Sequence, residues 1–531
     1  MSLAAVIGAS LVLYPRVSFL TLVGTVAGLT LLARKPWTRV ARKPGGGDGT
    51  AAGHGPARAV WVITGALLVA ANLLAQTRPT LVERGFASGM VLMAAYAVSR
   101  WRQGRDFRIP LLPVSTMMYA LYFAMPVFTR TTDAPLLLTP VTEAGLQEAL
   151  LVSFFGLGSL LVGYYSLRRS TVEVRSGEHH SFQWGLAGTR LWAAALGLLG
   201  LVAYMILLVQ SVPAVVAQSL GLLSSLTLLA AVLLFVLRQY GEVGRWADWY
   251  LWGILVPLRM LIGLGSGFNF AAAELVIILG MAAWTLNRRI SSGAIVLGLS
   301  VLIFLQPIKT EFREKYGFAD QSSLSPVTRG TEFAAIAVSG MTRQFAYRDA
   351  FDQFSRRHGF LNAFSVVVVA TPKTVPYWDG TTYKPLLSLA IPRVVFSGKP
   401  RENTGATFGH RYGLLAANDD VTSYNLPVII EFYANFGLVG VLIGMFLLGM
   451  LYRAIATFFA RRMSSPASIA AAVYVLSGLL LIEVNLSLAI EQVAYRMIVV
   501  ASLAWLTRLI QPRTPRAAMP AAAGLLPSPG S

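Results

Sequence analysis

The sequence predicts an all-α integral membrane protein, a polytopic bundle of 13–14 transmembrane helices with one large extracytoplasmic loop domain. Three observations lead to this prediction. Only 13% of the 531 residues are charged and 55% are hydrophobic, whereas about a quarter of an ordinary soluble domain is charged. The mean hydropathy is +0.61. The apolar residues also form runs of the length that crosses a hydrocarbon core, which takes roughly 20 residues.

The apolar runs define the expected spans and divide the chain. They lie near residues 17–33, 59–76, 85–99, 110–128, 148–165, 191–209, 220–237, 249–263, 270–286, 293–307, 426–451, 468–486 and 494–510. Residues 2–14 are also apolar but short for a span, so the expected count is thirteen or fourteen. The predicted parts are an N-terminal bundle (1–307), the loop domain (308–425), C-terminal helices (426–510) and a disordered Pro- and Ala-rich tail (511–531).

The basic residues indicate how the chain is threaded, because short loops rich in Lys and Arg stay cytoplasmic. Alternate loops near residues 34–43, 100–108, 168–175, 288–289 and 461–462 carry most of these charges. We therefore expect a cytoplasmic C-terminus and an extracytoplasmic segment 308–425. Most of the net charge of +20 then reflects topology, and nucleic acid is not an expected partner. The absence of cysteine excludes disulfides, thiolate metal sites and cysteine-based enzymes.

Cationic side chains gather in one segment of the predicted loop domain, "IPRVVFSGKPRENTGATFGHRYG" (391–413). It holds Arg393, Lys399, Arg401, His410 and Arg411 among several Gly and Pro residues. Gly permits close backbone approach and Pro stiffens a turn, so these cations are expected on a shaped loop. Such a loop suits a phosphate or pyrophosphate. A loop that merely rests on anionic lipid head groups is an equally good interpretation of the residues alone.

Two further charged residues flank this loop. Arg313 follows a predicted membrane helix, where it either faces the same site or marks the membrane interface. Glu431 lies near the outer mouth of the next predicted span. A carboxylate at that depth is costly unless it is hydrated or paired, which makes Glu431 a functional candidate. The alternative is an interfacial Glu431 paired with one Arg of the loop.

Other ionisable residues lie within the predicted spans, namely Arg259, Glu274, Glu483, Glu491 and Arg496. A charge at the membrane centre costs about 2.5–3.5 kcal/mol, so each is expected to find a partner or water inside the bundle. Several are expected to pair with one another as structural contacts. Arg259 differs because it lies one to two helical turns below a Gly-Ser-Gly turn, within reach of the outer cavity.

Residues 371–444 carry a resemblance to a known family. The segment contains Ile391-Pro392-Arg393, then Lys399-Pro400, then the helix start "EFYANFG" at 431–437. This order of elements resembles the late outer loop and following helix of bacterial oligosaccharide repeat-unit polymerases, the Wzy-type O-antigen and exopolysaccharide polymerases. The number of spans and the single large outer loop are similar along the whole chain.

The resemblance implies a GT-C-like fold and a metal-independent glycosyltransferase without a cofactor. Its substrates would be undecaprenyl-pyrophosphate-linked oligosaccharides, joined at the outer face of the bacterial cytoplasmic membrane, with membrane lipids around the spans. Whether a chain-length-regulating co-polymerase acts as a further partner stays open.

The implied site has two kinds of residue. Arg393 would stabilise the charge that develops on the departing pyrophosphate, and Glu431 or His410 would take the proton of the attacking hydroxyl. A lone loop His is more often a bystander, so both interpretations of His410 stay open. The remaining cations would bind pyrophosphate or glycan: Lys399, Arg401, Arg411, Arg313 and Arg259.

Three alternatives remain at this level. A lipid-linked oligosaccharide ligase would use the same fold and cations with a different acceptor. A polysaccharide flippase or transporter would place its charges along a central path and would not need the segment 308–425. A membrane scaffold for the same biosynthetic route would tolerate alanine throughout the cationic segment.

Overall fold

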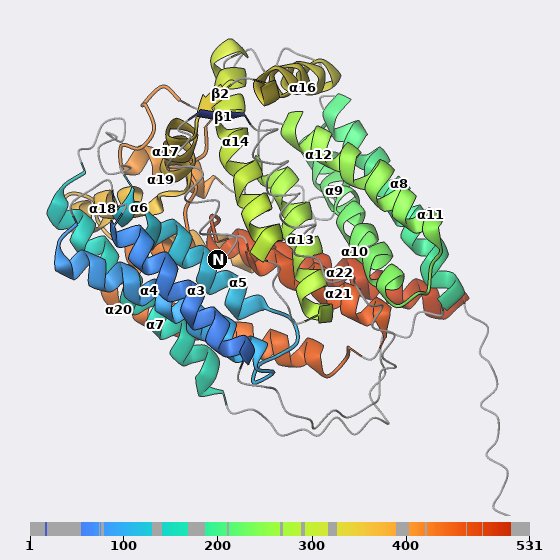
Figure 1. The fold of residues 1–531 in the computed structure, drawn as a ribbon, viewed down its shortest axis with the longest axis horizontal. Helices are drawn as coiled ribbons and strands as arrows, with labels where there is room; N and C mark the ends of the chain where they lie inside the picture. The colour runs from blue at the N-terminus through green and yellow to red at the C-terminus, as the bar shows by residue number, and fades with distance from the viewer. Residues whose placement is uncertain are drawn as a thin grey trace, which may run out of the picture.

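The computed structural model describes residues 16–18, 55–73, 75, 79–129, 141–167, 186–209, 212–265, 269–287, 292–316, 326–342, 344–388, 403–419, 422–463, 465–480 and 482–510. This part of the chain is almost entirely helical (Figure 1), which confirms the predicted helical fold. The two described strands, β1 (Arg16–Ser18) and β2 (Gln344–Ala346), form one short antiparallel ribbon. Most of the predicted first span, the core of the cationic segment and the tail lie outside the described residues.

The helices follow the predicted apolar runs. The first group is α3 (Gly55–Leu73), α4 (Leu81–Arg102), α5 (Leu111–Tyr119), η1 (Ala120–Ala124), α6 (Met125–Phe128) and α7 (Glu143–Ser166). The second is α8 (Leu186–Val209), α9 (Ala214–Ser224), α10 (Leu226–Gln239), α11 (Arg245–Asp248), η3 (Trp249–Leu255), α12 (Val256–Gly265) and α13 (Asn269–Asn287). The C-terminal group is α20 (Val428–Ala460), α21 (Pro466–Ser477), η5 (Gly478–Leu480) and α22 (Leu486–Ile510).

Six helical segments in the described part of the chain are long and apolar enough to cross a membrane: Leu81–Arg102, Leu111–Phe128, Glu143–Ser166, Ser219–Gln239, Val428–Ala460 and Leu486–Thr507. Four shorter apolar helices coincide with other predicted spans: Arg58–Leu73, Trp192–Leu207, Glu274–Asn287 and Pro466–Leu480. The predicted span 249–263 instead contains the π-helical segment η3. These helices support a multi-pass membrane protein.

Residues 308–425 contain more regular structure than a loop. α14 (Ser292–Tyr316) runs past the predicted end of its span, and it is followed by α16 (Pro326–Thr342), α17 (Tyr347–His358), α18 (Phe360–Ala370), η4 (Thr381–Ser388) and α19 (Thr404–Arg411). α18 is buried along most of its length and packs against α7 and α20. Its apolar run was too short to be predicted as a span, and packing between two longer helices is what buries it.

The helices α7 and α20 pack closely along much of their length and run side by side in the lower left of Figure 1. Small residues allow this approach. A Cβ added at Gly163 of α7 would lie 2.0 Å from the carbonyl oxygen of Phe446, and one at Gly449 of α20 would lie 2.1 Å from that of Leu160. Close backbone packing at small residues is the usual way in which membrane helices associate.

Several helices end together around Asp106, which follows α4. Its Oδ1 accepts hydrogen bonds from the Tyr164 hydroxyl of α7 at 2.8 Å and from Nη1 of Arg453 of α20 at 3.4 Å. Nearby, Arg108 donates from Nε to the carbonyl oxygen of Thr285, at the end of α13, at 2.8 Å. The C-terminal ends of α4, α7, α13 and α20 therefore lie at one end of the bundle, and this end carries the arginines that the sequence predicts to be cytoplasmic.

Candidate functional site

The opposite end of α20 meets the start of α22 through a buried carboxylate. Glu431 is fully buried, and its Oε2 accepts a hydrogen bond of 2.7 Å from the backbone N–H of Leu486, the first residue of α22. The first backbone N–H groups of a helix have no partner within the helix and carry partial positive charge, so a carboxylate there is stabilised. Glu431 thus joins two membrane helices that are separated in sequence by α21.

Asn435, one turn further along α20, holds a turn of the chain between these helices. Its Oδ1 accepts from the backbone N–H of Gly380 at 2.8 Å, and its Nδ2 donates to Oγ1 of Thr382 at 2.9 Å. From the other side, the hydroxyl of Ser487 in α22 donates to the carbonyl oxygen of Thr382 at 3.1 Å. We call residues 376–383 the clamped turn, because both helices bind it.

Aromatic side chains complete the clamped turn. The ring of Tyr383 lies 6.3 Å from the rings of Phe432 and Phe436, centroid to centroid. Gly437 interrupts α20 with φ 64°, a conformation that favours glycine, and an added Cβ would lie 2.7 Å from Oη of Tyr377. Burial, and to a smaller degree the nearby carboxylate of Glu431, raises the pKa of Tyr383. The phenol therefore stays neutral.

These contacts give a structural account of the element "EFYANFG" (431–437). In the sequence, this element is marked by one carboxylate and by its resemblance to repeat-unit polymerases. In the structure, Asn435 binds the clamped turn directly, Gly437 makes room for it, and Glu431 fixes the neighbouring α22. The element therefore holds the clamped turn, which precedes residues 389–402 in the chain. Those residues lie outside the described part.

Arg411, on the short helix α19, binds the same turn. Its Nη2 donates to the carbonyl oxygen of Pro376 at 2.7 Å, and its guanidinium lies 4.7 Å from the centre of the Trp378 ring. The backbone N–H of Trp378 in turn donates to the carbonyl oxygen of Ala434 of α20 at 3.1 Å. Arg411 and Glu431 therefore belong to one assembly, and His410 lies half-buried beside Arg411 on α19.

A second carboxylate at this end was noted in the sequence only as a charge within a span. Glu483, between α21 and α22, accepts from the Tyr122 hydroxyl at its Oε1 and from Nδ2 of Asn425 at its Oε2, both at 2.7 Å. The signal for it was a Glu in the apolar run "LLLIEVNL". Glu148 of α7 is a third, accepting from the hydroxyl of Tyr433 at 3.3 Å, and nothing in its local sequence marks it.

Arg259 lies in a different polar cluster. It is 6% exposed, its guanidinium lies 4.1 Å from the centre of the Tyr204 ring, and within the described part of the chain its Nε and Nη1 have no hydrogen-bond partner. Near this cluster, Arg496 of α22 donates to Glu274 of α13, which confirms the predicted pairing for these two of the five charges within the spans. Arg496 follows the start of α22 by about 15 Å at the rise of a helix, so this cluster is deeper in the bundle than Glu431.

The other predicted site residues are placed as follows. Arg313 lies half-buried in the last turn of α14, whose Phe312 packs against Phe333 of α16 with ring centroids 5.5 Å apart. Arg393, Lys399 and Arg401 lie outside the described residues. The structure therefore brings Glu431, Arg411 and His410 to one end of the bundle and puts Arg259 in the cluster below it.

Comparison with known families assigns most of this chain. Residues 186–509 match the family described as a domain of unknown function, DUF8712. The chain belongs to the DUF8712 family. No curated protein and no solved structure matches it. The DUF8712 region runs from α8 to α22, so it contains the clamped turn and the Arg259 cluster, and the contact between Tyr433 and Glu148 joins it to the preceding helix α7.

Proposed function

We propose that this DUF8712 protein is a membrane glycosyltransferase that polymerises undecaprenyl-pyrophosphate-linked repeat units into a surface polysaccharide, such as O-antigen, capsule or exopolysaccharide. The resemblance of residues 371–444 to repeat-unit polymerases supports this proposal. The observation that carries it is the assembly at the start of α20. There, Asn435 and Gly437 hold the turn that Arg411 also binds and that leads into the cationic segment, and Glu431 fixes the neighbouring start of α22.

The distribution of charge supports an outer location for this assembly. Arg453 lies 16 residues beyond the break in α20 at Gly437, about 24 Å at the helical rise, whereas Glu431 lies before the break. Arg453 pairs with Asp106 at the arginine-rich end of the bundle. The residues that flank Asp106 in the sequence include Arg100, Arg102, Arg105 and Arg108. Short loops rich in Lys and Arg stay cytoplasmic, so the proposed topology puts the arginine-rich end of the bundle on the cytoplasmic side and the clamped turn on the outer side. The membrane is then the bacterial cytoplasmic membrane, with a cytoplasmic C-terminus.

The proposed chemistry needs cations and one base. The hydroxyl of the acceptor repeat unit attacks the anomeric carbon of the donor glycan, and the bond from that carbon to the pyrophosphate oxygen breaks. The electron pair leaves with the lipid pyrophosphate, whose growing charge is stabilised by fixed guanidinium and ammonium groups. Arg411 is held in place by its contacts with Pro376 and Trp378. The remaining cations of the segment are Arg393, Lys399 and Arg401.

The base must receive the proton of the attacking hydroxyl within hydrogen-bond reach. Glu431 is fully buried and holds the start of α22, which favours a positioning role. His410 is half-buried at the surface of the same assembly, and imidazole is the side chain that most often serves as a general base. In the proposed mechanism His410 accepts the proton and Glu431 keeps the two helices in register.

The deciding experiment is elongation in proteoliposomes that contain the purified protein and a lipid-linked repeat unit extracted from its own cells. The wild type should give a glycan ladder on a gel, and Arg393→Ala should give none while remaining folded by size-exclusion chromatography. Arg105→Ala, which removes an exposed arginine at the other end of the bundle, is the matched control and should give a full ladder. Equal ladders from Arg393→Ala and the wild type would refute the role of Arg393.

Two further outcomes concern the reaction and the base. No elongation by the wild type refutes polymerisation, and transfer of a preformed glycan to a different acceptor would identify a ligase instead. Glu431→Gln keeps an oxygen that accepts from Leu486 N–H, so it should retain the ladder, whereas His410→Gln should lose it. The reverse pattern assigns the proton transfer to Glu431.

A further inference from the structure

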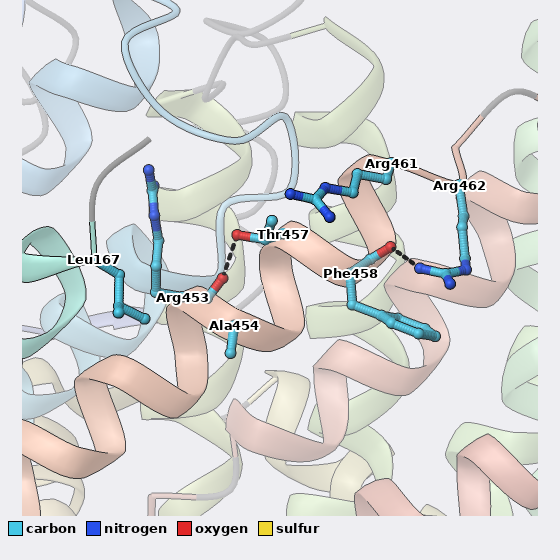
Figure 2. A pocket seen from close by; sticks show the side chains of 7 residues that line it. All are labelled: Leu167, Arg453, Ala454, Thr457, Phe458, Arg461 and Arg462. Atoms are coloured by element: carbon cyan, nitrogen blue, oxygen red, sulfur yellow. Dashed lines mark hydrogen bonds between the residues drawn. The ribbon is translucent and has the colours of Figure 1, made fainter. Parts of the chain in front are cut away.

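A basic pocket of about 420 Å³ lies at the arginine-rich end of α20 (Figure 2). It is formed by the last turns of α20 and by Leu167, which follows α7. The lining side chains are Leu167, Arg453, Ala454, Thr457, Phe458, Arg461 and Arg462. Three of the seven are arginines and none is acidic, so the pocket is chemically suited to an anion. It lies at the other end of α20 from Glu431, beyond the break at Gly437, and takes no part in the proposed transfer reaction.

One of the three arginines, Arg453, is held in place and neutralised by a carboxylate. The side chain of Arg453 is buried and donates to Oδ1 of Asp106, and its guanidinium lies 4.4 Å from the centre of the Phe107 ring. Asp106 is also held by the hydroxyls of Tyr164 and Tyr165. Removing Arg453 would leave a buried carboxylate uncompensated, so its contribution is structural as well as electrostatic.

The other two arginines carry the excess charge. Arg462 donates from Nη1 to the carbonyl oxygen of Phe458 at 2.9 Å and lies 3.7 Å from the centre of its ring. In Figure 2, Arg461 extends toward Thr457. Among the residues that the structure describes, neither guanidinium pairs with a carboxylate. Two positive charges that have no carboxylate partner among the described residues therefore face a pocket wide enough for a head group.

An exposed apolar stripe on α20 leads into this pocket. Val439, Ile443 and Leu447 are 55–64% exposed and repeat every four residues, which places them on one face of the helix. The same face continues through exposed Ala454 to Phe458, and both line the pocket. On a helix that spans a membrane, such a stripe contacts acyl chains. The arginines of the pocket therefore lie next to an apolar helix surface that contacts lipid.

We propose that this pocket binds the phosphate head group of an anionic phospholipid of the cytoplasmic leaflet, with an acyl chain along the stripe of α20. Guanidinium groups bind phosphate oxygens through paired, charge-assisted hydrogen bonds. Basic pockets between membrane helices on the cytoplasmic side are known sites for anionic head groups. A soluble phosphate would use the same arginines but would gain nothing from the stripe, which is why a lipid is the occupant.

The test is native mass spectrometry of the purified protein in neutral detergent, with phosphatidylglycerol and phosphatidylcholine of identical acyl chains as probes. The wild type should retain phosphatidylglycerol at least tenfold more tightly than phosphatidylcholine. Arg461→Gln combined with Arg462→Gln should weaken phosphatidylglycerol binding by about fivefold for each arginine removed. Millimolar inorganic phosphate should leave the bound lipid in place.

Two controls separate the pocket from general surface charge. Arg105→Gln combined with Arg245→Gln removes the same charge from exposed positions outside the pocket and should leave lipid binding unchanged. Ala454→Trp fills the pocket without altering charge and should abolish the preference for phosphatidylglycerol. Equal weakening by the two double variants, undiminished binding to Ala454→Trp, or displacement of the lipid by inorganic phosphate each overturns the proposal.

Discussion

The close packing of α7 on α20 predicts a large effect for a single methyl group. In Gly163→Ala the new Cβ would lie 2.0 Å from the carbonyl oxygen of Phe446 and 2.7 Å from its carbonyl carbon. Both atoms belong to the backbone of α20, so no side-chain rotation can remove the clash. An ordinary contact between carbon and oxygen is about 3.4 Å, and the helices would have to separate by roughly 1.4 Å.

The expected change in the free energy of unfolding follows from two opposing effects. Overpacking a close contact costs about 3 kcal/mol when the obstacle cannot move aside. Replacing Gly by Ala inside a helix returns about 1 kcal/mol, because Ala loses less backbone entropy. Gly163→Ala should therefore destabilise the protein by about 2 kcal/mol. Gly449→Ala should behave alike, since its Cβ would lie 2.1 Å from the carbonyl oxygen of Leu160.

The assay compares apparent melting temperatures in detergent by fluorescence-detected size exclusion. The matched control is Gly158→Ala on the same helix, where the added Cβ meets, among the described residues, only Cε of Met93 at 3.8 Å. The control should melt at or above the wild-type temperature, and Gly163→Ala should melt several degrees below it. If Gly163→Ala and Gly158→Ala have the same melting temperature, the close contact between α7 and α20 is refuted.

Two further predictions concern buried or stacked arginines. Arg411→Lys keeps the charge but loses the flat stacking on Trp378, worth about 1 kcal/mol, and should slow elongation about fivefold in the proteoliposome assay; unchanged elongation would show that the stacking is dispensable. Glu274→Gln leaves Arg496 without its carboxylate and should cost about 3–5 kcal/mol in detergent melting. Combining it with Arg496→Met should recover most of that loss, and a double variant as unstable as the single one would contradict the pairing.

Much of the candidate site was visible in the sequence as residue types and positions. Glu431 is conspicuous as a carboxylate at the start of an apolar run, and Arg411 belongs to an evident cationic segment. Their roles were not visible. The partner of Glu431 is a backbone N–H 55 residues further on, and Arg411 binds a carbonyl oxygen 35 residues earlier. A side chain that caps another helix gives no local pattern, because its partner is any exposed backbone group.

The sequence by itself determined that this chain is helical and rich in membrane-length apolar segments, and it located most of the apolar helices and the ends rich in arginine. Those properties depend on local hydropathy and on charge next to each span. Only the tertiary structure decided which charges meet: Arg496 with Glu274, 222 residues apart, and Arg453 with Asp106, 347 residues apart. Such pairs depend on which helices are neighbours and how each is rotated about its axis, and close tertiary contacts such as those at the small residues of α7 and α20 decide both.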